Sequence, residues 1–205
     1  MSVTPTPARS PNPRGKGQQH RDELLAAASD LFAEHGNTHA VSLRAVASRA
    51  GVSPTAVYRH FEDHDDLMHA AVEYCGAQFG DALAAGLDDL TDPYKRFRTA
   101  GHNYVTFAQE FPGRYQVMYA DPAGNVDSPS GVVAFTFLVG MVTDILDRNG
   151  DDRDPVLVSM LVHAWMHGIV GLHPLCQISE EIPDPGMNTL LDELVVRMGL
   201  GPLTS

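Results

Sequence analysis

The sequence is poor in cysteine and has no long apolar run free of charged residues or histidine. Its two cysteines, Cys75 and Cys176, are too few for a disulfide framework and favour a reducing cytoplasm. The apolar stretches at 131–146 and 156–175 end among aspartates or carry histidines, so we expect neither to span a membrane. We also expect no secretion signal, because the first residues lack an apolar segment. These features favour a cytoplasmic protein without a membrane partner.

Positive charge is also scarce, and it is distributed unevenly. The chain has 14 Lys and Arg against 26 Asp and Glu, a formal net charge of −12. Residues 1–60 hold seven basic and four acidic residues, a balance of +3, whereas residues 61–205 hold seven basic and 22 acidic residues, a balance of −15. Phosphate binding needs local positive charge, since much of the affinity comes from released counterions. A basic first part on an acidic body therefore favours DNA docking in one orientation.

The first 19 residues differ from the rest in composition. They are rich in Pro, Ser, Thr and Gly, include three basic residues and contain almost nothing apolar. Such a segment cannot bury enough surface to order itself, so we expect a disordered basic arm over residues 1–19. It is either a passive tail or an arm that contacts the minor groove or the phosphates.

The remaining chain is predicted to be all-α. Apolar residues recur at helical spacing and no stretch shows sustained alternation, which predicts about nine helices. Residues 20–66 form a predicted DNA-binding domain of three short helices, and residues 67–205 form a larger helical domain. The expected helices cover about 20–35, 43–50, 53–61, 64–79, 93–111, 114–119, 130–148, 154–173 and 184–198.

The most informative stretch is Ser42–Phe61, with the sequence SLRAVASRAGVSPTAVYRHF. It has the pattern of a short helix, a turn at Gly51 and a second short helix, which is the arrangement that places the second helix in the major groove of DNA. Small hydroxyl groups at the helix starts allow a close approach to the duplex, and Tyr and Arg side chains reach its backbone. The candidate DNA-binding residues are Ser42, Arg44, Ser53, Pro54, Thr55, Tyr58, Arg59, His60 and His64. By pattern alone, an ordinary helical hairpin with a solvated outer face is the alternative.

Residues 21–75 closely resemble the DNA-binding domain of the TetR family of bacterial regulators. The resemblance lies in LFAEHG of the first helix and then in SLRAVASRAGVSPTAVYRHFEDHDDL. It implies three helices for DNA and a larger helical domain for ligand binding and dimerisation. It further implies a homodimeric transcriptional repressor that binds a palindromic operator in double-stranded DNA and leaves it when a small-molecule effector binds.

His64 departs from the family pattern. The family usually has a lysine here, at the start of the fourth helix, where it contacts a phosphate. Histidine is neutral or only partly charged near neutral pH. We therefore expect weaker anchoring to the DNA backbone and an operator affinity that rises as the pH falls.

The second half of the chain carries a shorter resemblance. The sequence AWMHGIVGL, which contains Trp165, His167 and Gly168, is similar to the Trp-x-His-Gly signature of one type of TetR C-terminal domain. That resemblance implies that the last two helices pack against their symmetry mates as a four-helix interface. The apolar residues available for it are Val156, Leu157, Met160, Leu161, Ala164, Ile169, Leu190, Leu191, Leu194 and Val195.

An effector pocket is indicated by large residues on the middle helices, several of which have a polar tip. Such residues suit an apolar or aromatic ligand, because Met adapts to shape while Tyr and His orient the ligand. The expected pocket residues are Tyr104, Phe107, Phe111, Tyr115, Met118, Phe137, Met141, Trp165 and His167, with Tyr119 and Phe135 as further candidates. Aromatic and Met residues at helical spacing are more often ordinary core, which is the alternative for each of them.

Two other functions were weighed. A metal enzyme is suggested by His163 and His167, which are four residues apart on one helix. However, Ala164 stands where a zinc protease needs a glutamate base, so we expect neither catalysis nor a metal or other cofactor. A helical protein-binding adaptor with an unused helix-turn-helix is the second alternative. The basic and hydroxyl-bearing residues over 42–60 argue against it.

Overall fold

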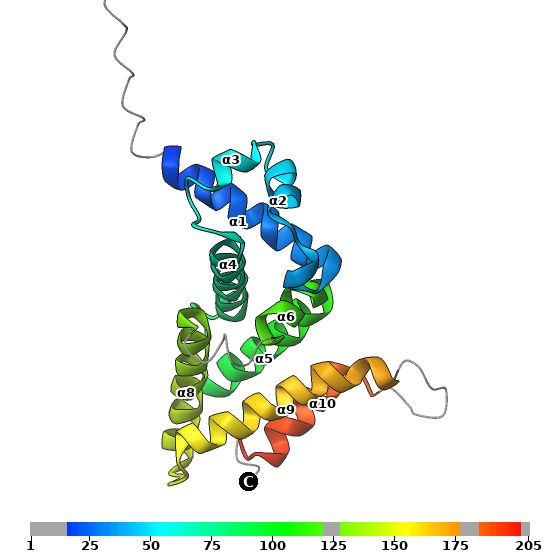
Figure 1. The fold of residues 1–205 in the computed structure, drawn as a ribbon. Helices are drawn as coiled ribbons and strands as arrows, with labels where there is room; N and C mark the ends of the chain where they lie inside the picture. Colours follow the sequence, from blue (N-terminus) through cyan, green and yellow to red (C-terminus); the bar gives the residue numbers. More distant parts are fainter. Residues whose placement is uncertain (1–15, 121–127, 177–184, 202–205) are drawn as a thin grey trace, which may run out of the picture.

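The computed structural model describes residues 16–120, 128–176 and 185–201, and helices joined by turns and short loops make up these ranges. Nine α-helices and one 3-10 turn are present in the described ranges, with no strand, which confirms the all-α prediction. Figure 1 shows α1 to α3 at one end, α4 next to them, and α9 beside α10 at the other end. The DNA-binding candidates and the expected ligand domain therefore lie at opposite ends of the molecule.

The first three helices form the predicted N-terminal unit. They are α1 (Lys16–His35), α2 (Leu43–Arg49) and α3 (Pro54–Val57), with a 3-10 turn at Thr38–Ala40. The first helix ends at Gly36, whose φ of +62° only glycine adopts without strain. Helix α1 begins at Lys16, four residues before the expected start at His20, so the last part of the expected arm is helical. Residues 1–15 of that arm lie outside the described residues.

Helix α4 (His64–Ala84) connects the two ends of the molecule. Asp63 caps it as expected, because the Asp63 carboxylate accepts a hydrogen bond from the backbone N–H of Asp66 at 2.9 Å. The helix continues beyond Phe79, and it packs against α1, α5, α6 and α8. It is thus in contact with both the N-terminal unit and the larger domain.

Within the described residues, the larger domain has five further helices. They are α5 (Pro93–Glu110), α6 (Pro112–Tyr119), α8 (Pro129–Asn149), α9 (Pro155–Cys176) and α10 (Met187–Arg197). Pro112 was expected only to end α5, but it is also the first residue of α6, two residues before the expected start at Arg114. Proline is tolerated there because the first helical N–H has no intrahelical partner.

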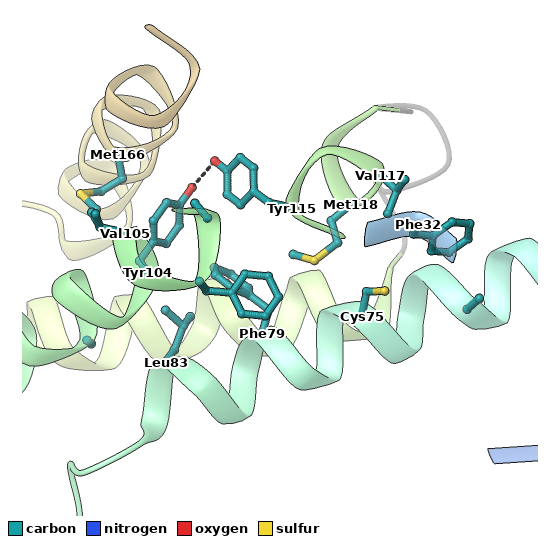
Figure 2. Close-up of a cluster of buried hydrophobic side chains, with 14 of the residues drawn as sticks. Phe32, Cys75, Phe79, Leu83, Tyr104, Val105, Tyr115, Val117, Met118 and Met166 are labelled. Carbon is teal, nitrogen blue, oxygen red and sulfur yellow. Dashed lines mark hydrogen bonds between the residues drawn. The ribbon is translucent and has the colours of Figure 1, made fainter. Parts of the chain in front are cut away.

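One continuous core joins the two parts. Cys75 and Phe79 on α4 are buried, and the Phe79 ring meets Tyr104 and Phe107 of α5 edge to face at centroid distances of 5.2 and 5.1 Å. Figure 2 shows this cluster, with Phe79 below Tyr104 and Cys75 further along α4. Edge-to-face ring contacts add to the stabilisation from buried apolar area.

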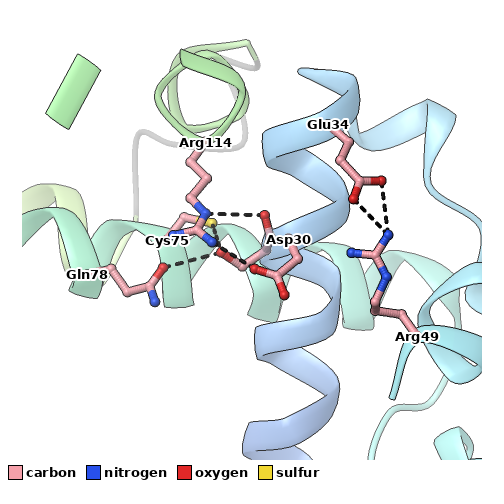
Figure 3. Close-up of polar contacts among 7 residues, drawn as sticks. Asp30, Glu34, Arg49, Cys75, Gln78 and Arg114 are labelled. Carbon is pink, nitrogen blue, oxygen red and sulfur yellow. Dashed lines mark hydrogen bonds and ion pairs between the residues drawn. The ribbon is translucent and has the colours of Figure 1, made fainter. Parts of the chain in front are cut away.

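Helix α6 is fastened to α1 by two neighbouring residues. Gly113 lies so close to α1 that an added Cβ would meet the carbonyl oxygens of Phe32 and Ala33. The guanidinium of Arg114 donates hydrogen bonds to the Ser29 carbonyl at 3.3 Å and to Asp30 at 2.8 Å (Figure 3). The larger domain therefore touches the first helix directly as well as through α4.

Candidate nucleic-acid interface and ligand cavity

The α2–α3 unit has the local structure that the sequence predicts. Ser42 caps α2 by accepting a hydrogen bond from the Ala45 N–H at 3.2 Å, and Gly51 forms the turn with a φ of +69°. Val46 and Val57 are fully buried and hold the two short helices against α1. Helix α3 is shorter than expected, because regular helix ends at Val57 and residues 58–60 form a turn.

The candidate DNA-binding residues come together on the outer side of this unit. Those with exposed side chains are Ser42, Arg44, Ser53, Pro54, Thr55, Tyr58 and Arg59, and His60 and His64 are half-buried. Tyr58 is 59% exposed, which is unusual for an aromatic residue beside a packed helix pair. The structure thus forms one surface from residues that are up to 22 positions apart in sequence.

Two arginines on this surface have side chains without a partner among the described residues. The guanidinium groups of Arg44 and Arg59 make no hydrogen bond or ion pair in the described ranges. By contrast, Arg49 pairs with Glu34 at 2.8 Å (Figure 3), and Arg21 lies over the Phe61 ring. An unpaired arginine can neutralise a phosphate without first breaking an internal contact.

His64 is the first residue of α4, as expected, but its ring is engaged with the chain itself. Nε2 lies 2.8 Å from the Val41 carbonyl oxygen and Nδ1 lies 3.2 Å from the Asp65 carboxylate. The hydrogen bond to Val41 raises the pKa of His64 above its usual value, and Asp65 adds to this effect. The ring therefore connects the first turn of α4 to Val41, which lies just before α2. Tighter operator binding at lower pH stays a prediction.

A cavity of about 440 Å³ lies in the larger domain between α4, α5, α6, α8 and α9, with one residue from α10. Among the expected pocket residues, Tyr104, Met118, Phe137 and Met141 line it. The further candidates Tyr119 and Phe135 line it as well. The cavity thus lies among helices on which the sequence predicts an effector pocket, and its role as that pocket stays a prediction.

The other five expected pocket residues lie outside the lining. Phe107 packs against Phe79 in the core, and Phe111 lies under the Arg114 guanidinium. The remaining three are Tyr115, Trp165 and His167. These three residues lie on α6 and α9, which also carry lining residues, but their side chains are turned toward other neighbours.

Tyr115 and His167 do not line the cavity, but hydrogen bonds connect them to Tyr104, which does. The Tyr115 hydroxyl lies 2.7 Å from the Tyr104 hydroxyl and 2.7 Å from Nδ1 of His167. Burial raises the pKa of Tyr104 and Tyr115, so both stay neutral hydroxyls. Trp165 is 38% exposed and does not line the cavity, whereas Val162 and Met166 on the same helix do.

Other lining residues were not expected from the sequence. The most informative is His163, which was considered only as a metal ligand. Among the described residues, no three His, Cys, Asp or Glu side chains gather to hold a metal ion. Small residues also line the cavity, for example Gly76 and Gly101. Glycine at a helical position is the sequence signal for such a close approach.

An exposed apolar surface runs along α9. It is formed by Val156, Leu157, Met160, Leu161, Ala164, Trp165 and Leu172, and we call it the α9 face. The expected interface residues Ile169, Leu191, Leu194 and Val195 are instead buried within the chain, because α10 packs its apolar side against α5 and α9.

By length and composition alone, α8 and the 155–173 part of α9 could each cross a membrane. The buried share of their most apolar parts is 22% and 28%.

The fold and these two sites define a helix-turn-helix DNA-binding protein with a helical ligand-binding domain. Residues 24–71 match the family model of bacterial regulatory proteins of the tetR family, and residues 97–198 match a tetracyclin repressor-like C-terminal domain. The chain belongs to the TetR family of transcriptional regulators. The Trp-x-His-Gly subtype stays a prediction.

Solved structures show the same fold. A protein of unknown function from Rhodococcus sp. RHA1 is 24% identical, with 87% of this chain and 93% of that chain covered and a TM-score of 0.71. The regulator FadR from Bacillus subtilis in complex with stearoyl-CoA is 13% identical, with coverage of 89% and 98% and a TM-score of 0.67. A putative TetR-family regulator from Vibrio parahaemolyticus is 22% identical, with coverage of 84% and 97% and a TM-score of 0.64.

Proposed function

We propose that this chain is a cytoplasmic homodimeric repressor, without enzymatic activity, that leaves a palindromic operator when a small molecule fills the cavity. The observation that carries the proposal is the pair of unpaired arginines, Arg44 and Arg59, on the exposed side of a helix-turn-helix. A repressor needs such a surface at one end and a ligand site that is mechanically connected to it. Both features occur in this chain.

On the DNA side, α3 enters the major groove and the surrounding residues contact the backbone. The hydroxyl groups of Ser53 and Thr55 at the start of α3 approach base edges. Tyr58, Arg44 and Arg59 reach phosphates, which fixes the position of α3 on the duplex. The acidic body repels DNA elsewhere and so favours this single orientation.

The α9 face supports dimerisation with a second copy. Its residues Leu157, Met160 and Leu161 are more than half exposed in one chain, which is costly for adjacent large apolar side chains in water. The symmetric packing of two α9 faces removes these side chains from water. It also provides two α3 helices, as required by two half-sites of a palindrome.

The cavity is connected to the DNA-binding end through α4 and α6. Phe79 of α4 and Met118 of α6 line the cavity, while Gly113 and Arg114 of α6 contact α1 directly. A ligand that moves these helices changes the position of α3 relative to its symmetry mate. Binding of ligand and binding of operator are then coupled through a two-state dimer.

The test is a selection of bound duplexes from a random pool, followed by a salt titration on the enriched sequence. An inverted repeat with a steep salt dependence is expected, and Arg44→Ala should weaken binding. Arg197→Ala is the matched control, since Arg197 lies on α10 and pairs with Glu193. If no sequence is enriched at low salt, the helix-turn-helix is unused, and the protein-binding adaptor becomes the better explanation.

A further inference from the structure

The described lining of the cavity carries no Lys or Arg side chain. The segments 121–127 and 177–184, which lie outside the described residues, contain neither in their sequences. The chain from residue 61 onward also carries a balance of −15. A carboxylate or phosphate buried here would have no compensating cation, and burial of an unpaired charge is very unfavourable. The cavity is therefore unsuited to an anionic ligand.

The lining is polar near the start of α8 and apolar further along it. Ser128 and Ser130 lie at the first end, whereas Met141 and its neighbours Phe97 and Leu191 are apolar. Ser130 and Met141 are eleven residues apart, which corresponds to about 16 Å along the helix axis. A ligand that fills this space is long, and most of its surface is apolar.

Most polar groups of the lining already have protein partners. The hydroxyls of Tyr104 and Tyr119 are hydrogen-bonded to neighbouring tyrosines. Ser128 is hydrogen-bonded to Glu73, and the Ser130 hydroxyl lies 3.1 Å from that of Ser128. These groups are satisfied without a ligand.

Two lining side chains, those of Thr136 and His163, have no hydrogen-bond partner among the described residues, but Thr136 is exposed to solvent and His163 is not. The His163 ring is half-buried and contacts the rings of Phe135 and Tyr119 at centroid distances of 6.3 and 6.0 Å. Burial, assisted by nearby His167, lowers the pKa of His163, so the ring is neutral at physiological pH. A neutral imidazole offers one donor and one acceptor.

We propose that the cavity binds an uncharged molecule with a long apolar body and one hydroxyl or carbonyl group, which forms a hydrogen bond with the ring of His163. This inference rests on the proposed function only in treating the bound molecule as the effector. It differs from the ligand of the Bacillus subtilis structure, whose coenzyme A part carries phosphates.

The test compares three probes that share a ten-carbon chain and differ in their polar group: decanol, decanoate and decanoyl-CoA. Each is titrated by calorimetry into the full-length protein at a pH where decanoate is ionised. Decanol should bind at least about tenfold more tightly than the other two, because only decanol enters without burying a charge. Equal or tighter binding of decanoate or decanoyl-CoA, or no binding of decanol, overturns the proposal.

Variants test the role of His163. His163→Phe keeps the ring contacts but removes both nitrogens, and it should weaken decanol binding roughly tenfold, the usual cost of an unmade hydrogen bond in a buried site. His163→Gln should restore most of the affinity, while His69→Phe, on the exposed side of α4, should change nothing. Unchanged decanol binding by His163→Phe overturns the assignment of His163.

Operator release is measured separately. If decanol binds with the expected preference but leaves the operator affinity unchanged, the ligand class holds and the effector role fails. If decanoate or decanoyl-CoA releases the operator instead, the repressor mechanism holds and the ligand class proposed here fails. The two proposals therefore fail by different outcomes.

Discussion

Replacement of Gly113 by alanine tests whether the contact between α6 and α1 fixes the two ends of the molecule. A Cβ at Gly113 would lie 2.8 Å from the carbonyl oxygen of Ala33 and closer still to that of Phe32. An ordinary carbon–oxygen contact is about 3.3–3.6 Å, so α6 must move away by roughly 1 Å. Both clashing atoms belong to the backbone of α1, which cannot turn aside as a side chain can.

The expected cost follows from this forced movement. Overpacking of this kind costs about 1–3 kcal/mol, and it also lengthens the hydrogen bonds from Arg114 to Ser29 and Asp30. The higher helix propensity of alanine offsets about 0.5–1 kcal/mol. For a chain of this size each kcal/mol shifts Tm by about 2–4 °C, so we expect Gly113→Ala to melt several degrees below wild type.

Gly140→Ala is the matched control. Gly140 is an exposed residue of α8, and no atom lies within 4 Å of the position of an added Cβ. Here only the helix propensity changes, so Tm should rise slightly. Thermal unfolding followed by circular dichroism compares the two variants at equal protein concentration. A Gly113→Ala variant as stable as Gly140→Ala would show that α6 is not held tightly on α1.

Three further changes test other parts of the structure. Raising the pH from about 6 to about 8 should lower the Tm of wild type more than that of His64→Gln. The Val41 carbonyl raises the pKa of His64 in the folded protein, so protonation of His64 stabilises the fold. This stabilisation is complete below the pKa of His64 in the unfolded chain, near 6.5, and is lost as the pH rises through the folded pKa. Equal Tm changes in the two proteins would contradict it. Arg59→Ala should reduce the salt slope of operator binding by about one unit, and an unchanged slope places Arg59 away from the phosphates. Leu161→Glu should give a folded monomer in sedimentation velocity, whereas a persistent dimer would exclude the α9 face as the interface.

The local structure of the chain could be predicted well from sequence. Ser42, Asp63 and Asp92 cap helices that begin where the sequence predicts them, at 43, 64 and 93, because capping depends only on a side chain and the next few backbone N–H groups. Gly51 has the positive φ that its turn was expected to need. These features are decided within a few residues, so tertiary contacts do not override them.

The partner of each apolar face could not be predicted in the same way. Leu157 on α9 and Leu191 on α10 both belong to apolar stripes of similar appearance in the sequence. In the structure Leu157 is exposed and Leu191 is buried, since α10 fills the space beside α5. Helical periodicity shows that a helix has an apolar face, but it does not show whether that face packs within the chain or on another copy.

The ligand site shows the same limit for polar groups. Tyr115 on α6 and His163 on α9 both have a ring with a polar group, and their positions in the sequence do not distinguish their roles. A buried polar group needs a hydrogen-bond partner, and the Tyr115 hydroxyl has two within the protein, at 2.7 Å each. His163 lines the cavity and, over the described residues, its ring nitrogens have none. The difference depends on which side chains lie across the core, and only the three-dimensional arrangement supplies it. Whether a polar side chain has a hydrogen-bond partner within the protein therefore separates a residue that stabilises the cavity wall from one that is available to a ligand.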